Sequence, residues 1–205
     1  MLRQICALLF LIFSFQVIFA QRKPPMKWGK IDASQLQMSD YEPDTSAAAV
    51  VLCNFGKIDV EFFGDEFNYR FTQHKRIKIL KDSGLDYGDV IVPYYRHEGF
   101  ERMAYFKGQV LSPTGEKKEL KKNVDFFYEK INKRWSAVKA AFPVEVGSVI
   151  EYKFEIVSEG LVIPIMREEM SQGSKLFRAK VLYKRRNKGP INDRLLLIQH
   201  CQSLC

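Results

Sequence analysis

The sequence is poor in cysteine, with four in 205 residues, and this excludes a disulfide-stapled scaffold. Cys6 lies in an apolar leader, and Cys53, Cys201 and Cys205 are an odd set, so any disulfide among them leaves one thiol over. Small stapled folds need a framework of several bridges because they cannot build a sufficient core. The apolar content here can build one, so we expect a fold stabilised by its hydrophobic interior.

A hydrophobic run long enough to cross a membrane is also missing. The apolar stretch Ala7–Phe13 is interrupted by polar residues before Val17–Ala20, and falls short of the roughly twenty residues that a spanning helix needs. Arg3 ahead of this run and a polar segment after it are typical of a secretory signal peptide, here residues 1–20, cleaved after Ala20. Retention as an anchor is the alternative. We therefore expect a periplasmic or secreted protein.

The body of the chain lacks a basic excess, although the formal net charge is +8. Residues 161–205 hold nine Lys or Arg against three acidic residues, whereas residues 21–160 hold twenty-two against twenty-one. General nucleic-acid binding needs a basic face on the folded domain and is excluded on this ground. The basic run Lys184–Arg186 with Lys188 is interpreted as a solvated tail, with contact to an anionic envelope surface as the alternative.

No arrangement of residues typical of catalysis is present. A nucleophilic Cys53 would need a base such as His74 or His97 beside it, because a thiol becomes reactive only when its pKa is lowered. Cys53 instead ends an apolar segment, so we interpret it as a structural cysteine. We expect no catalytic residues and no cofactor, and hence a protein that is not an enzyme.

Two groups of residues resemble metal sites only superficially. One consists of His200, Cys201 and Cys205, which offer three ligands where a structural zinc site needs four. The other is an acidic cluster around Gly64, formed by Asp59, Glu61, Asp65 and Glu66. Its spacing is less regular than that of a calcium loop, so a solvated hairpin tip is favoured over a calcium site. We expect no metal.

Alternating apolar and polar residues dominate from Ala47 onward and predict antiparallel strands. The first predicted elements are a hairpin over 49–62 that turns at Asn54–Lys57 and a long strand over 67–80 with one wet face. An edge strand over 90–95 that contains Pro93 follows. The remaining elements are a second hairpin of 102–111 and 117–122 and a strand over 149–156. The segment 123–132 is ambiguous between helix and strand, and Asp32 with Gln35 predicts a short helix.

These elements predict a mainly β fold, an antiparallel β-sandwich or open barrel with one or two short helices and an irregular C-terminal tail. The expected organisation is a signal peptide over 1–20, a lead-in with a short helix over 21–40, a β domain over 41–157 and a divergent basic tail over 158–205.

Four segments in this order carry a resemblance to a known family: Tyr41–Leu52, Ile77–Tyr87, Phe142–Pro143 and Val146–Tyr152. Over about residues 28–157 the chain resembles the domain of unknown function 3857, which precedes transglutaminase-like domains in secreted proteins of Bacteroidetes-type bacteria. The resemblance implies a mostly β domain without catalytic residues, followed in fuller relatives by a papain-like transglutaminase domain with its own Cys, His and Asp. From Gly160 on the sequence departs from the family pattern, and we interpret this as truncation or an altered reading frame.

The sequence therefore favours an extracytoplasmic, non-catalytic β domain that acts as an accessory or protein-interaction module beside a transglutaminase-like domain. Strand addition to a protein or peptide partner is the expected mechanism. The rival is the N-terminal fragment of a transglutaminase-like enzyme that lacks its catalytic half. A third candidate is a glycan-binding module. The aromatic residues expected to line a groove for a sugar or peptide are Tyr94, Tyr95 and Trp135.

Overall fold

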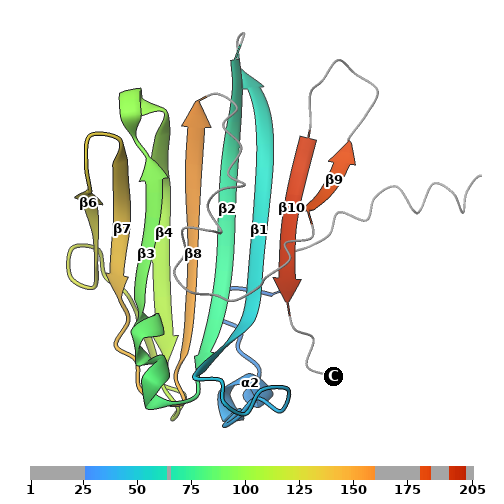
Figure 1. Ribbon diagram of the computed structural model, residues 1–205, viewed down its shortest axis with the longest axis vertical. Coiled ribbons are helices and arrows are strands. Elements are labelled where there is room, and N and C mark those ends of the chain that lie inside the picture. The colour runs from blue at the N-terminus through green and yellow to red at the C-terminus, as the bar shows by residue number, and fades with distance from the viewer. Residues whose placement is uncertain (1–25, 64–65, 160–180, 186–193, 202–205) are drawn as a thin grey trace, which may run out of the picture.

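Two antiparallel sheets make up the fold (Figure 1). The computed structural model describes residues 26–63, 66–159, 181–185 and 194–201. The strands are β1 (Ala49–Phe63), β2 (Glu66–Ile79), β3 (Asp89–Tyr95), β4 (Glu101–Leu111), β5 (Lys117–Glu119), β6 (Phe126–Lys130), β7 (Trp135–Ala141), β8 (Val149–Glu159), β9 (Val181–Arg185) and β10 (Arg194–Cys201). Their order is β5-β4-β8-β2-β1-β10-β9 in the seven-stranded sheet and β3-β7-β6 in the three-stranded sheet. The predicted mainly β, antiparallel fold is confirmed.

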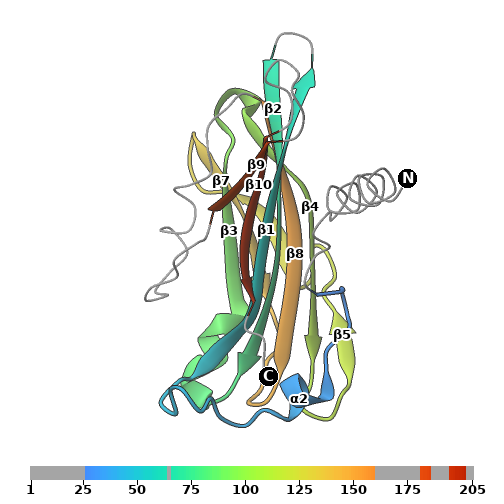
Figure 2. The ribbon, with the colours of Figure 1, turned by 90° about the vertical axis from the view of Figure 1, so that its right-hand side faces the viewer.

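The helical elements among the described residues are short. They are α2 (Ala33–Gln37) and two 3-10 helices, over Asp82–Gly88 and His97–Gly99. Asp32 is the N-cap residue of α2, as the sequence predicts, but its side chain makes no capping hydrogen bond. In Figures 1 and 2, α2 lies near one end of the long strands.

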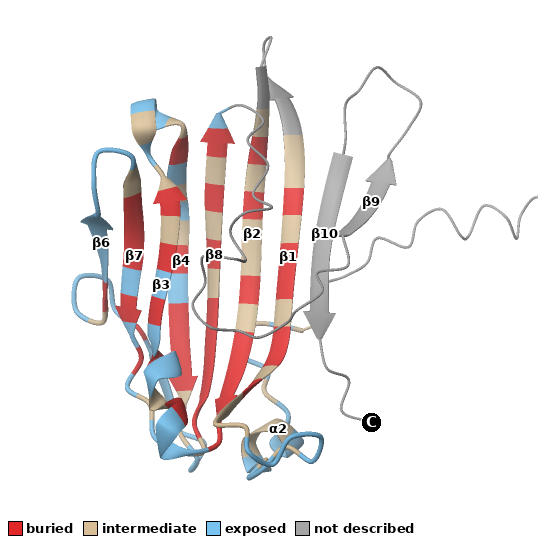
Figure 3. Ribbon diagram, viewed as in Figure 1, coloured by how far each residue is buried: buried red, intermediate tan, exposed pale blue. Residues whose placement is uncertain are grey.

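The hydrophobic core lies between the two sheets. Alternate residues of a strand point to opposite faces, and in β8 this directs Ile150, Tyr152, Phe154 and Ile156 inward. The three-stranded sheet contributes Val92, Tyr94, Phe126, Val138 and Ala140 from the other side. Figure 3 shows the buried residues along the middle strands of the large sheet. Burying a large apolar side chain contributes about 1.5–3 kcal/mol, so this interior is the main source of stability.

The predicted hairpin turn at Asn54–Lys57 is wrong. β1 runs through this segment without reversing, and Gly56 pairs with Gln73 of β2 on one side and with Ile198 of β10 on the other. Because hydrogen bonds to both neighbours hold the backbone extended, the glycine does not act as a turn. The chain reverses instead between Phe63 and Glu66, which face each other in the pairing of β1 with β2.

Other predicted elements agree with the structure. Pro93 lies in β3, an edge strand of the small sheet, where its missing N–H removes no bond of the sheet interior. β4 and β5 form the predicted second hairpin. The ambiguous segment 123–132 contains β6, which pairs with β7 and buries Phe126 in the core.

Two strands lie within the segment expected to be a tail. β9 and β10 pair with each other, and β10 extends the large sheet by pairing with β1. The apolar run Leu195–Ile198, for which the sequence shows no partner, thus lies along β1, with Leu196 opposite Ile58. The boundary at residue 157 remains a prediction.

A buried carboxylate links the two sheets beside the core. Glu101, at the start of β4, accepts a hydrogen bond from the hydroxyl of Tyr69 in β2 and another, 2.6 Å long, from the backbone N–H of Tyr95 in β3. The bond from the Tyr95 N–H joins the small sheet to the large sheet at this end, whereas the bond from Tyr69 joins two strands of the large sheet.

Substitution of Gly108 by alanine is expected to destabilise the core by about 1–3 kcal/mol, the usual effect of overpacking. A Cβ at this position would lie 2.6 Å from Cζ of the buried Phe142 ring. Urea unfolding measures the change. The double variant G108A/F142L should lose less stability than the two single variants together, since the smaller side chain makes room; strictly additive losses would contradict the packing described.

Candidate functional site

A cluster of buried polar side chains lies on the face of the large sheet that points away from the core. It consists of His74, Arg76 and Lys78 of β2, Gln109 of β4 and Glu151 of β8, each at most 4% exposed. We call it the Glu151 cluster. Alternation places these residues opposite the core-facing ones in the same strands. The wet face predicted for the strand over 67–80 is therefore wrong along His74–Lys78, because a distant segment covers it.

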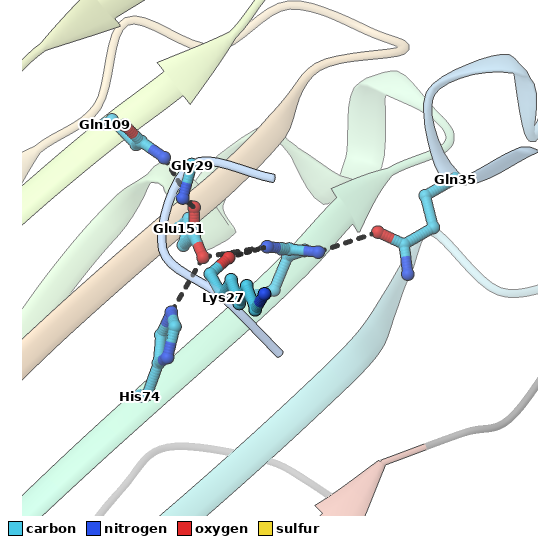
Figure 4. Close-up of polar contacts among 7 residues, drawn as sticks. Lys27, Gly29, Gln35, His74, Gln109 and Glu151 are labelled. Carbon is cyan, nitrogen blue, oxygen red and sulfur yellow. Dashed lines mark hydrogen bonds and ion pairs between the residues drawn. The ribbon is translucent and has the colours of Figure 1, made fainter. Parts of the chain in front are cut away.

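Glu151 is the centre of the cluster (Figure 4). Its Oε1 accepts hydrogen bonds from His74 Nε2 at 2.7 Å and from an Arg76 guanidinium nitrogen at 2.8 Å. Its Oε2 accepts from the backbone N–H of Gly29 at 2.9 Å and from Gln109 Nε2. Burial alone would raise the pKa of Glu151, but the bonds from His74 and Arg76 and the Arg76 charge lower it to about 2. The carboxylate is ionised at neutral pH.

The covering segment is Met26–Gln37, which we call the strap. Arg76 donates to the Lys27 carbonyl at 3.2 Å and to Gln35 Oε1 at 2.9 Å. Lys78 donates to the Leu36 carbonyl at 2.6 Å and to the Gly147 carbonyl. Burial lowers the pKa of Lys78, whose charge is held by these carbonyl oxygens.

Aromatic and apolar side chains of the strap also contact the sheet, and two of them, Ile31 and Leu36, pack against the hydrophobic cluster that contains Leu52 and Val149. The Trp28 ring lies 5.7 Å from the His74 ring between centroids, and Lys107 Nζ lies 4.1 Å from the centroid of the same indole. Met26 packs against Cys53 and Phe55 of β1. A cation over the face of an aromatic ring is attracted to it, and this interaction contributes about 0.5–1 kcal/mol of stability at a partly exposed site.

The cluster binds the strap and shows none of the chemistry of an acid–base pair. Glu151 is fully engaged and ionised, and the His74 nitrogen that faces it donates to it. A general acid or base must exchange a proton with a substrate, and the strap covers the side chains of Glu151 and His74. The arrangement therefore supports segment binding.

The structure separates the three aromatic residues predicted to line one groove. Tyr94 is buried in the core, whereas its chain neighbour Tyr95 points to the opposite face of the small sheet. Tyr95 and Trp135 face each other across β3 and β7 with ring centroids 5.3 Å apart, and His97 stacks on Tyr95 at 6.0 Å. Of the three, only Tyr95 and Trp135 share a face of the small sheet, and a ligand groove at these residues stays a prediction.

The remaining candidate residues fall in different places. Cys53 is disulfide-bonded, which removes the thiol that a nucleophilic role with His74 or His97 would require. Asp59 pairs with Lys57 at 2.8 Å. The side chains of Glu61, Asp65, Glu66, Lys184–Arg186, Lys188, His200, Cys201 and Cys205 lie outside the described part of the molecule, as does the predicted signal peptide.

Among the residues that the structure describes, no group of three or more His, Cys, Asp or Glu is placed to hold a metal ion. Within the same ranges, none of the helices has the length and apolar character needed to cross a membrane.

Replacing Glu151 by glutamine should cost roughly 3–5 kcal/mol of unfolding free energy at pH 7, because it leaves the buried Arg76 cation without its counter-charge. Since the folded-state pKa of about 2 lies below the reference value of 4.5, the stabilisation by Glu151 is present above pH 4.5 and is lost as the pH falls toward 2. Urea unfolding across this range should show about 3 kcal/mol of pH-dependent stability that E151Q lacks.

The exposed ion pair of Glu129 and Lys139 provides the control. Its nitrogen and oxygen are 2.8 Å apart, the same distance as in the Arg76–Glu151 pair, but both side chains are about half exposed. E129Q should change stability by less than about 1 kcal/mol. Equal losses in E151Q and E129Q would contradict the burial argument.

Comparison with known proteins agrees with the resemblance seen in the sequence. The family described as a domain of unknown function with a solved structure (DUF3857) matches residues 66–187, more than half of the chain. Among solved structures, the chain is similar to a crystal structure described as "a putative protease from Parabacteroides distasonis", with 9% identity and a TM-score of 0.46 over 65% of this chain and 32% of that one. No curated protein matches the chain.

The chain thus spans about a third of the length of that solved protein. The matched region contains β2 to β9 and with them every member of the Glu151 cluster, while the strap lies ahead of it. By this match, the chain belongs to the DUF3857 family.

Proposed function

We propose that this chain is a non-catalytic accessory domain that binds a protein or peptide partner outside the cytoplasm. The observation that carries the proposal is an exposed apolar edge on the small sheet. β6 pairs with β7 on one side, and in the described part of the chain a single bridge between Lys122 and Phe126 is the only other strand pairing that β6 makes.

Three exposed apolar side chains lie along this edge, next to the charged Glu129 and Lys130. Phe127 and Ile131 are 50% and 49% exposed, and Tyr128 is 39% exposed. Across the same face, Ile91 of β3 and Phe127 of β6 flank Lys139 of β7 in register. An edge strand with unpaired backbone groups and an apolar rim is suited to strand addition, in which main-chain bonds give affinity and side-chain contacts give specificity.

The Glu151 cluster supports the non-catalytic part of the proposal. Its charged groups are used to hold the strap, and the sulfur of Cys53 is in a disulfide. By family membership the partner we favour is a transglutaminase-like domain.

Two features support action outside the cytoplasm. Residues 1–20 have the pattern of a cleaved signal peptide. A disulfide at Cys53 is typical of an oxidising compartment.

Phe127→Lys tests the binding edge. Extended peptides are selected by phage display on the immobilised mature chain, and their affinities are measured by fluorescence anisotropy. F127K should weaken binding by about tenfold or more, because it places a charge on the apolar rim, while the unfolding midpoint stays nearly unchanged at this exposed position.

Tyr87→Lys is the matched control, since Tyr87 is an aromatic residue of similar exposure, in the 3-10 helix over Asp82–Gly88 and away from β6. Binding that is lost in Y87K but kept in F127K would refute the assignment of the edge. Hydrolysis or cross-linking of casein by the purified chain alone would refute the non-catalytic role.

Export is tested on the native protein by mass spectrometry. The mature chain should begin at Gln21, and Cys53 should resist alkylation until a reductant is added. An intact Met1 terminus together with an alkylatable Cys53 would contradict action outside the cytoplasm.

A further inference from the structure

The sheet holds the strap largely through the strap's main chain. Arg76 donates to the Lys27 carbonyl, Lys78 donates to the Leu36 carbonyl, and Glu151 accepts from the Gly29 N–H. In the strap these groups lie in a turn, where the Lys30 N–H donates to the Lys27 carbonyl, and in the helix α2. Because main-chain groups occur in every peptide, the buried charges of the sheet are suited to bind a segment that takes up this turn, whichever chain supplies it.

Two positions of the strap add selectivity. Trp28 contacts both His74 and Lys107. Gly29 adopts φ +72°, a conformation that L side chains rarely adopt. The site is thus complementary to an aromatic residue followed by glycine.

The strap is also built as a separable piece. No strand of the sheet pairs with it, and its helix α2 is five residues long without a buried residue. Its hydrogen bonds to the sheet come from a few side chains, in contrast to the continuous ladders that join the strands. Its apolar side chains Met26, Ile31 and Leu36 are only partly buried where they pack on the rest of the fold. Segments held by partly buried contacts open locally at a fraction of the global free energy of unfolding.

The strap leaves two buried polar atoms of the cluster unpartnered. Arg76 Nε and Gln109 Oε1 have no hydrogen-bond partner among the described residues. The Arg76 Nε–H is a donor and the Gln109 Oε1 is an acceptor. One further peptide group offers a carbonyl oxygen for the first and an N–H for the second. Each unmade bond at a buried group costs about 1–3 kcal/mol, so an occupant that supplies both partners has an advantage over the strap.

We propose that the outer face of β4, β8 and β2 is a binding groove for a peptide that carries an aromatic–glycine pair in a turn, and that the strap occupies it as an exchangeable ligand of the same chain. The groove is separate from the β6 edge, which lies on the small sheet. A ligand supplied by another chain binds by displacing the strap.

The test uses the full mature chain with Trp28→Ala, which weakens the strap but leaves the sheet unchanged. The probe is a synthetic peptide of residues 24–38 with fluorescein at its N-terminus, followed by anisotropy. The peptide should bind W28A at least about tenfold more tightly than it binds the wild-type chain, in which the intact strap competes. A peptide carrying Trp28→Ala and Gly29→Val should not bind.

The control is Trp135→Ala, which removes the other tryptophan of the sequence and leaves the strap intact, so it should behave like the wild type. F127K should bind this peptide as well as the wild type does, which separates the groove from the β6 edge. A W28A chain that is folded by circular dichroism and does not bind the peptide overturns the proposal.

If W28A does not fold, a wild-type chain with a protease site inserted between Glu42 and Pro43 is used instead. These residues are exposed between the strap and β1. After cleavage, the labelled peptide should replace the severed strap within hours. Retention of the strap without exchange shows a fixed structural element and overturns the proposal.

Discussion

The carboxylate of Glu151 joins parts of the molecule that are far apart in the sequence. It receives hydrogen bonds from β2, β4 and the strap, and the bond to Gly29 spans 122 residues. Without an anion at this point, Arg76 would be a buried cation with only neutral partners, the carbonyl of Lys27 and the amide of Gln35. Burial of the charged side chains on this face of the large sheet therefore depends on this charge balance, whereas the opposite face is stabilised mainly by apolar packing.

The alternation in the strands made much of the fold predictable. Val149–Ile156 shows the strand pattern directly, and Pro93 predicts an edge position because proline cannot donate to a ladder. Gly56 misled the prediction, since a glycine two residues after an asparagine is typical of a turn. Only the pairing of β1 with both β2 and β10 shows why the chain continues straight there.

The Glu151 cluster could not be predicted from the sequence. His74, Arg76 and Lys78 occupy alternate positions of β2, the pattern of a solvated face, and nothing in the local sequence shows that a segment from the N-terminal side covers them. The pairing of Arg76 with Glu151 in neighbouring strands follows from the register of β2 with β8, which is a property of the whole sheet. Tyr94 was misassigned for a simpler reason, because adjacent residues of a strand face opposite ways.

The two sheets thus have different roles. The small sheet exposes an apolar edge at β6, and charged groups of the large sheet form hydrogen bonds with the backbone of the strap. Both arrangements are suited to binding chain segments, which is the role that we propose for this member of the DUF3857 family.

The most direct measurement of the central claim is the hydrogen-exchange rate of the Gly29 amide, resolved by NMR at neutral pH. The account predicts exchange at least about a hundredfold slower than in the isolated strap peptide, because the N–H donates to the buried Glu151 carboxylate. In E151Q that protection should fall toward the peptide rate while Val138 in β7 remains protected. A Gly29 amide that exchanges as fast in the wild-type chain as in the free peptide would contradict the account.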